Sequence, residues 1–541
     1  MGFLSRAFYF SVGLATVVWV ASLYSRVPRE QLTQIRKEGH VIAGAFVVFA
    51  VFLMTRAVVP AKQSRRYRGV GKSILDTVLL MWTPSDPFRI RDLVAGGVCI
   101  IGRTGSGKTS SSGFQLARAI VGIPVTAGCI IASKPEDKQF WQKIFNAAGR
   151  NADLLVFEPR SGLQFNVIDF EMQNGGDSHE VTRFILTIDD AMQRSGNGGG
   201  TNEKFWEKSK ARTIYNGVEI IRKAIGKVSA PSLAALITDA ATSEAQLTEE
   251  KWRQGNHCQM LAEAMKAPKT EAEEHDYRQA VDFWLGEWPR MDVKVRSSIM
   301  ADIMGVLHTL NTGEIRTLLS GGTNVSPAIM ERSKWVLVNM PVHEKGAGGL
   351  AVSTAWKYAT QRHILRRHAN RTTNPIIIWC DEYQNVCNSV QDAAFLAETR
   401  SHLGGMVVLT HGLHSFQTSA KGEEGNRHAM SLMSNFPVKV VHSLAEHDTA
   451  KFASNLVGRA LQQRGGFSRS PRANLWDDMM GEGGMSFNSS ERMEEILEPN
   501  EFFRLRTGGE INNFEADAIV IKSGEPFAWG GNWLKVAFSQ R

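Results

Sequence analysis

Cysteine is scarce in this chain of 541 residues, which contains only five copies. None of them forms a CxxC pair or has the spacing of paired metal ligands, so the sequence argues against a disulfide-stapled module and against a zinc ribbon. We expect reduced thiols in a cytoplasmic body. With 43% hydrophobic and 21% charged residues, the chain can bury a large core, which also argues against wholesale disorder and a polytopic transporter.

Net charge is absent from most of the chain. Residues 1–72 contain 11 of the 62 Lys and Arg residues but only 2 of the 54 Asp and Glu residues. Residues 73–541 are left with 51 basic and 52 acidic side chains. Net charge therefore gives no reason to assign nucleic-acid binding to the main body, and any such function must rest on local patches or on a motif.

Two uncharged runs near the N-terminus predict a membrane anchor. The first comprises the 19 residues between Arg6 and Arg26, close to the ~20 that a helix needs to cross a lipid bilayer. The second, 41–55, is short by itself but continues through Arg56 to Ala61, and the Arg56 side chain can reach toward the headgroups. The Arg and Lys residues that follow are typical of the cytoplasmic side. We predict a two-helix hairpin with the body in the cytoplasm; a secretory signal peptide is the alternative for the first run.

A phosphate-binding loop follows the apolar run at residues 96–101. Its sequence, GRTGSGKT, has the pattern GxxxxGK[ST], and a helix-compatible stretch comes next. Backbone N–H groups of such a loop surround nucleotide phosphates, Lys108 is predicted to reach the β and γ phosphates, and the Thr109 hydroxyl is predicted to bind Mg²⁺. The predicted nucleotide-binding residues are Gly102, Arg103, Thr104, Gly105, Ser106, Gly107, Lys108, Thr109 and Ser110.

A second apolar run supplies the expected partner of this loop. Residues 375–382 read PIIIWCDE, which is typical of a buried parallel strand that carries Asp381 and Glu382 at its carboxyl end. Asp381 is predicted to complete the Mg²⁺ site, and Glu382 is predicted to polarise the attacking water. ATP and Mg²⁺ are therefore the expected cofactors, and ATP hydrolysis is the expected activity.

The remaining apolar runs predict the fold. They alternate with helical stretches, which is typical of a doubly wound α/β domain with a parallel sheet. The further strand candidates are 128–133, 154–158, 335–340, 406–410 and 438–442.

The pattern changes between residues 179 and 319, where long helical stretches occur without a convincing strand. This predicts an all-α domain inserted into the α/β domain. The predicted organisation is a membrane hairpin with a basic juxtamembrane segment at 1–72, a nucleotide-binding domain in two parts at 73–170 and 331–541, and the inserted all-α domain at 171–330.

With these motifs in place, the sequence resembles the coupling proteins of bacterial type IV secretion and conjugation, a TraG-like branch of the ATPases that includes the FtsK and HerA translocases. The resemblance extends over nearly the whole chain. Besides the two nucleotide motifs, it rests on FEPRSGLQFN at 157–166, MERSKWVLVNMP at 330–341, AETRSHLGGMVVLTHG at 397–412, DTAKFASNLVG at 448–458 and GEPFAWGGNWLKVAF at 524–538.

The resemblance implies a RecA/FtsK-like P-loop fold with an inserted all-α domain and a two-helix transmembrane anchor. It also implies a homo-hexamer in the bacterial inner membrane, multi-pass, with the ATPase body in the cytoplasm and a central channel for DNA. Arg400 matches the family's arginine before the sensor strand and is the candidate to act on the nucleotide of a neighbouring subunit, with Arg103 as its rival. The family usually has Gln at the end of that strand, where this chain has Thr410 and His411; His411 is the candidate sensor of the γ-phosphate.

On this resemblance we expect a membrane-anchored ATPase that couples a relaxosome, with its relaxase, to a type IV secretion channel and drives conjugative DNA transfer. Two alternatives stay open: a docking receptor for protein effectors that uses nucleotide as a switch, and an FtsK-like DNA translocase. The basic stretch 357–371 and the Gly/Ser-rich loop 462–472 are candidates for phosphate contacts in a channel, with a solvated face or a subunit contact as the alternative. His411 and His414 form an HxxH pair, but without acidic or Cys ligands at matching spacing it does not predict a metal site.

Overall fold

The computed structural model of the chain describes the backbone of two short strands, β1 (Val59–Pro60) and β2 (Lys62–Gln63), and residues 73–193, 203–370, 373–416, 422–469 and 485–541. The chain divides into two units, Met1–Val59 and Pro60–Arg541. The first predicted membrane span and residues 41–58 of the second lie outside the described residues, whereas Val59 and Pro60, near the end of the second predicted span, belong to β1 and not to a helix. Within the described ranges, no helix is long and apolar enough to cross a membrane.

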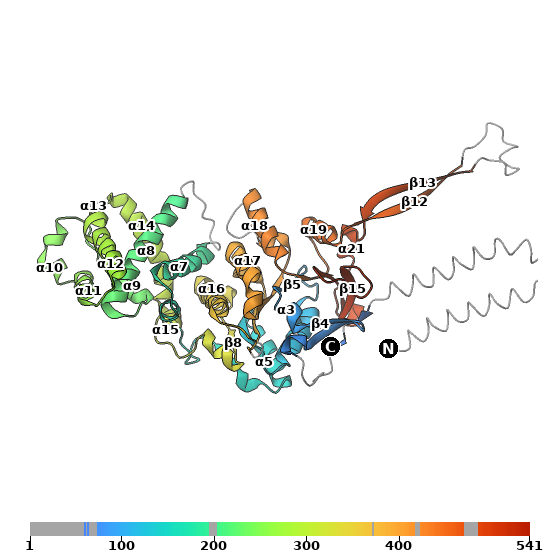
Figure 1. Cartoon of the computed structure of the whole chain (residues 1–541), viewed down its shortest axis with the longest axis horizontal. Coiled ribbons are helices and arrows are strands. Elements are labelled where there is room, and N and C mark those ends of the chain that lie inside the picture. Colours follow the sequence, from blue (N-terminus) through green and yellow to red (C-terminus); the bar gives the residue numbers. More distant parts are fainter. Residues whose placement is uncertain are drawn as a thin grey trace, which may run out of the picture. The chain divides into compact units, whose positions relative to one another are not determined.

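A large sheet runs through the second unit (Figure 1). Seven of its described strands are parallel neighbours, in the order β11-β5-β10-β9-β6-β8-β7. Their bounds are β5 (Gly97–Ile101), β6 (Ala127–Ile131), β7 (Leu154–Phe157), β8 (Trp335–Val338), β9 (Ile376–Cys380), β10 (Gly404–Thr410) and β11 (Val438–Val441). The predicted α/β fold with a large parallel sheet is thereby confirmed.

The apolar runs are continuous because the sheet is covered on both faces. In β5, Cys99 and Ile101 belong to one hydrophobic cluster, and Val98 and Ile100 belong to another. Successive strand residues point to opposite faces, so each face has its own core. The carboxyl ends of these strands form one edge of the sheet, which is where doubly wound folds bind their ligands.

The sheet is wider than the sequence predicted. β14 (Glu515–Lys522) pairs antiparallel with β11, and β15 (Trp533–Ser539) pairs antiparallel with β14. A separate antiparallel sheet contains β2, β3 (Val78–Thr83) and β4 (Asp86–Arg89). β14 matters for the site because its N-terminal residues reach the phosphate-binding loop.

Helices connect the strands of the sheet. The bounds are α3 (Ile90–Leu93), the π-helical turn η2 (Thr109–Gly113), α4 (Phe114–Val121), α5 (Asp137–Ala147), α16 (Val342–Arg366), α17 (Ser389–Glu398), α18 (Gly422–Ser434), α19 (His447–Val457) and α21 (Pro499–Phe503). Short 3-10 turns are η1 (Ile74–Asp76), η3 (Asn151–Asp153), η7 (Tyr383–Asn385), η8 (Thr399–His402), η9 (Leu413–Phe416) and η10 (Glu510–Asn512). α16 is kinked at Gly346, where φ is 53°.

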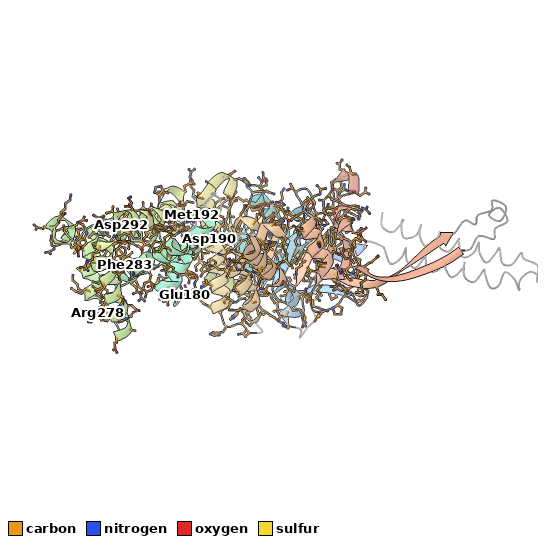
Figure 2. All side chains as sticks on the ribbon, turned by 90° about the horizontal axis from the view of Figure 1, so that it is seen from above. Glu180, Asp190, Met192, Arg278, Phe283 and Asp292 are labelled. Carbon is orange, nitrogen blue, oxygen red and sulfur yellow. The ribbon has the colours of Figure 1, made fainter. Side chains whose placement is uncertain are left out.

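No strand interrupts the described residues between β7 and β8, and the elements there are helices. Their core includes Phe283, which is labelled in Figure 2. Its ring and those of the buried Trp284 and Trp288 are in mutual contact. The assignment of these helices to a separate domain remains a prediction. They are α6 (Val167–Gln173), α7 (Ser178–Gln193), α8 (Glu203–Ile225), α9 (Ala230–Thr238), η4 (Gln246–Thr248), α10 (Glu250–Arg253), α11 (Asn256–Lys266), α12 (Glu271–Asp282), η5 (Phe283–Glu287), α13 (Trp288–Arg290), α14 (Val293–Leu310), α15 (Gly313–Leu319) and η6 (Pro327–Arg332).

The basic stretch 357–371 lies largely in α16, and several of the basic side chains in its described part, 357–370, are held in ion pairs. The Lys357 side chain is buried in an ion pair with Asp392. The next arginines join α16 to α6 and α7, and the predicted channel contact of this stretch stays untested. Arg362 and Arg366 each pair with Glu171 and Glu180.

The Gly/Ser-rich segment 462–472 is not a loop over its described part. It belongs to β12 (Arg459–Arg469), which pairs antiparallel with β13 (Met485–Glu495) in a two-stranded ribbon that extends from the body (Figure 1). The prediction of a loop was wrong because these strands lack the alternation of apolar and polar residues by which strands are recognised. The predicted DNA contact of this segment remains untested.

Candidate nucleotide-binding site

The loop between β5 and η2 is tightly curled. Its backbone takes positive φ at Gly105 (74°) and at Gly107 (84°), a conformation that favours glycine. A Cβ atom on Gly107 would lie 2.9 Å from the Cβ of Ala516 in β14 and 3.1 Å from the carbonyl oxygen of Thr507. The second glycine is therefore required by a close approach as well as by its backbone conformation.

Lys108 lies at the end of this loop and is buried. Its Nζ lies 3.5 Å from Nδ1 of His411, which follows β10. Burial lowers the pKa of Lys108, and the carboxylates of Glu382 and Asp381 oppose that effect. The ammonium group is thus held at the carboxyl edge of the sheet, between the loop and the end of β9.

Thr109 and Asp381 lie next to each other at the same edge. The Thr109 hydroxyl donates to Oδ2 of Asp381 over 3.3 Å. Burial, followed by the charge of Asp137, raises the pKa of Asp381 to about 6. Hydroxyl and carboxylate oxygens are the hard ligands that Mg²⁺ prefers, so this pair fits the cation expected at the site.

Glu382 has a strained backbone and a constrained side chain. Its φ of 46° is unusual for a residue other than glycine. Its carboxylate accepts from Nε2 of Gln384 over 2.6 Å and pairs with His411 at 2.8 Å and with Lys134 at 3.4 Å. Burial by itself would raise the pKa of Glu382, but the Gln384 hydrogen bond and the neighbouring positive charges outweigh it, so the pKa is lowered. The carboxylate is therefore ionised at neutral pH.

Five of the residues singled out in the sequence meet at this edge: Lys108, Thr109, Asp381, Glu382 and His411. Thr410, the other departure from the family pattern, is buried, and its hydroxyl donates to Oε1 of Gln384 over 3.4 Å.

Two polar residues of the site, Gln384 and His442, are not among the candidates that the sequence motifs indicate. Gln384 ties Glu382 to the end of β10, and its position two residues after the acidic pair was the available signal. His442 lies under the loop, where Nε2 shares a 2.7 Å hydrogen bond with the hydroxyl of Ser112. Burial lowers the pKa of His442 to about 4, so the ring is neutral. Nothing in the sequence around His442 distinguishes it from an ordinary strand end.

The two arginine candidates lie in different places. Arg103 lies in the loop, and its Nε donates to the hydroxyl of Ser443 over 3.3 Å. Arg400 is exposed in η8, at the amino end of β10. The seven residues of β10 span about 23 Å at roughly 3.3 Å per residue, so Arg400 is remote from the phosphate-binding loop of its own chain. Any contact of Arg400 with a nucleotide would have to be made on another copy.

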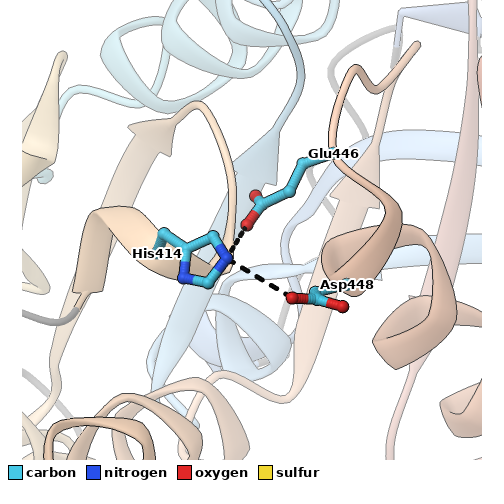
Figure 3. Close-up of side chains that lie close together, drawn as sticks. All are labelled: His414, Glu446 and Asp448. Carbon is cyan, nitrogen blue, oxygen red and sulfur yellow. Dashed lines mark ion pairs between the residues drawn. The ribbon is translucent and has the colours of Figure 1, made fainter. Parts of the chain in front are cut away.

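The two histidines of the HxxH pair have separate partners. His414 pairs with Glu446 at 2.7 Å and with Asp448 at 3.4 Å (Figure 3). These three side chains offer ligand atoms within 4.8 Å of one another, and the acidic partners come from a part of the sequence that spacing could not associate with His414. Glu446 and Asp448 flank the N-terminus of α19, where negative charge is favourable in any case, so we interpret the group as an ion-paired helix end.

No protein-family model and no curated protein sequence matches this chain. Solved structures do match. The unbound bacterial conjugative coupling protein TrwB, in the form TrwBdeltaN70, aligns with a TM-score of 0.56 at 14% identity and covers 90% of this chain and 94% of its own. The plasmid coupling protein TrwB in complex with ADP and Mg²⁺ aligns with a TM-score of 0.56 at 15% identity, over 90% of this chain and 97% of its own.

At a sequence identity this low, a structural match shows that two chains share a fold and does not show that they share an activity. The match nevertheless covers nearly the whole length of both chains. The chain therefore has the fold of a type IV coupling protein.

Proposed function

We propose that this chain is an ATPase that couples cargo to a type IV secretion channel in conjugation. One observation carries the proposal: a coupling-protein fold places Lys108, Thr109, Asp381 and Glu382 together at the ligand-binding edge of its sheet. TrwB has been solved with ADP and Mg²⁺ and with the ATP analogue ADPNP, which supports ATP and Mg²⁺ as the cofactors of this chain.

Each residue has a chemical task in the proposed reaction. Backbone N–H groups of the phosphate-binding loop hold the phosphates, and Lys108 neutralises the β and γ phosphates. The N–H groups of Gly102, Arg103 and Ser106 do not take part, because they donate to carbonyl oxygens within the chain. Thr109 and Asp381 hold Mg²⁺, which supplies further positive charge to the phosphate oxygens. Ionised Glu382 orients the attacking water and accepts its proton.

His411 occupies the position from which hydrolysis could be reported to the rest of the chain. Its ring lies between Lys108 and Glu382, with Nδ1 toward the ammonium and Nε2 toward the carboxylate. A change in charge at the γ-phosphate would alter both contacts at once. We propose that His411 performs the sensing role usually assigned to Gln in the family, and that Arg400 serves the nucleotide of a neighbouring subunit.

The finer assignments extend the proposal. The cargo is DNA with its attached relaxase, the partners are relaxosome proteins and components of the secretion channel, and the active assembly is a homo-hexamer anchored in the inner membrane by residues 1–72. The fold of TrwB, a conjugative coupling protein, supports this choice. A docking receptor for protein effectors would use the same nucleotide site, and it differs by predicting hydrolysis that ignores DNA.

Steady-state hydrolysis of ATP by the full-length protein in detergent tests the enzymatic part. We expect Lys108→Ala to lose nucleotide binding and hydrolysis, and Glu382→Gln to bind nucleotide but to retain only a small, measurable residual turnover. Lys143→Ala and Glu207→Gln, which change exposed residues of α5 and α8, are the matched controls and should behave as wild type. Turnover by Glu382→Gln at the wild-type rate would contradict the assigned role.

A further inference from the structure

Asp392, in α17, is a buried carboxylate with an unusually complete set of donors. It is fully buried. Oδ1 accepts from Nζ of Lys357 and from Nε2 of Gln361, each over 2.7 Å. Oδ2 accepts from the same Lys357 ammonium over 2.6 Å, from the backbone N–H of Asn388 over 2.9 Å and from the hydroxyl of Tyr383. A fully buried carboxylate is stable only where its hydrogen-bond donors and its ion-pair partner are held in place.

Two of these donors belong to the segment that follows the acidic pair. Tyr383 is the residue after Glu382, and Asn388 caps α17 by accepting from the N–H of Gln391. Asp392 therefore links the two ends of the connection from β9 to α17, because it accepts one hydrogen bond from Tyr383 and one from Asn388. These two hydrogen bonds fix both ends of the segment between Glu382 and Asn388.

This closure bears on the strain at Glu382. A non-glycine residue at positive φ costs about 1–2 kcal/mol and persists only where the surroundings impose it. On the near side, the Glu382 N–H donates to Oδ1 of Asp381 over 2.8 Å. On the far side, the constraint comes from Tyr383, whose buried hydroxyl is anchored on Asp392. The two anchors together set the direction in which the Glu382 carboxylate points.

The remaining donors come from a different part of the molecule. Lys357 and Gln361 lie one turn apart in α16. The following turns of this helix carry Arg362 and Arg366, which pair with Glu171 of α6 and with Glu180 of α7. One helix thus contacts both the anchor of the catalytic segment and the helices between β7 and β8.

We propose that Asp392 is a positioning residue for Glu382, acting through Tyr383 and held by Lys357 and Gln361 of α16. The inference rests on the proposed function, since it assumes that Glu382 orients water for hydrolysis. It adds buried residues that have no direct task in the proposed reaction, and it identifies α16 as the element through which the helical region reaches the hydrolytic carboxylate.

Tyr383→Phe tests this in the full-length protein, because it removes one hydroxyl and leaves the buried ring. We expect kcat for ATP hydrolysis to fall about tenfold while the affinity for nucleotide stays within twofold of wild type. Tyr277→Phe is the matched control: it removes a buried hydroxyl that donates to the carbonyl of Leu261 over 3.2 Å, within the helical region. It should lower the thermal midpoint comparably and leave kcat unchanged.

A double-mutant comparison separates positioning from a general loss of structure. If Tyr383 acts through Glu382, then adding Tyr383→Phe to Glu382→Gln should lower kcat no further, because the group being positioned is already gone. A further tenfold loss in that background, or a wild-type kcat for Tyr383→Phe alone, would overturn the inference. Absence of hydrolysis in the wild-type protein would instead overturn the proposed function, so the two failures are distinguishable.

Discussion

Removing the ammonium group from Lys357 should be among the most destabilising changes to a charged residue in this protein. The side chains of Lys357 and Asp392 are 3% and 0% exposed. In Lys357→Met the hydrocarbon stem is kept, but Asp392 retains only the neutral donors of Gln361, Tyr383 and Asn388. Leaving one partner of a buried ion pair uncompensated costs about 3–5 kcal/mol. In a protein of this size, each kcal/mol of unfolding free energy corresponds to a shift of roughly 2 °C in the thermal midpoint. The thermal midpoint should therefore fall by roughly 6–10 °C.

The same helix supplies the control. Lys345 pairs with Glu314 at 3.2 Å, with side chains that are 33% and 45% exposed, and such surface pairs contribute about 0–1 kcal/mol. Differential scanning fluorimetry of ligand-free Lys357→Met, Lys345→Met and wild type makes the comparison. Adding Asp392→Asn to Lys357→Met should recover part of the loss, because it removes the unpaired charge. Equal midpoints for the two lysine variants would refute the conclusion that Asp392 is a buried anion.

Two further predictions concern the site without ligand. Asp381→Asn should raise the thermal midpoint at pH 7.5, because burial raises the pKa of the Asp381 carboxyl to about 6 and its ionisation costs up to about 3 kcal/mol above that pH. The advantage should shrink as pH falls from 6 toward 4, where wild type takes up the proton, and a constant difference across pH 4–8 would contradict it. Gly107→Ala should lower the midpoint more than Gly105→Ala, since both have positive φ but only Gly107 would place a Cβ atom 2.9 Å from Ala516. Equal losses of thermal midpoint in the two variants would contradict a contribution from the close contact with Ala516 and would leave backbone strain as the common cause.

Motifs with a local physical basis were predictable from the sequence. The phosphate-binding loop needs glycine at its turns and an apolar strand before it, and Gly107 and β5 supply both within a few residues. Asp381 and Glu382 end a strand that is apolar because it is buried on both faces. The predicted parallel strands are present for the same reason.

Features that depend on partners distant in sequence were not predictable. The basic stretch at 357–371 has the composition of an exposed patch, and only the tertiary structure brings Glu171, Glu180 and Asp392 against it. Likewise, β14 is identified as a neighbour of the phosphate-binding loop only once its pairing with β11 is known. The roles of Arg400 and His411 remain predictions, because they concern a second subunit and a bound nucleotide.

The central claim is that hydrolysis at this site serves the movement of DNA. It is tested most directly by measuring ATP hydrolysis by the full-length protein in detergent, with no DNA, with single-stranded DNA and with double-stranded DNA. The proposed function predicts that DNA stimulates hydrolysis and that Lys108→Ala and Glu382→Gln abolish the stimulated rate. Hydrolysis that both substitutions abolish but that DNA leaves unchanged would contradict the claim and favour a docking receptor for protein cargo.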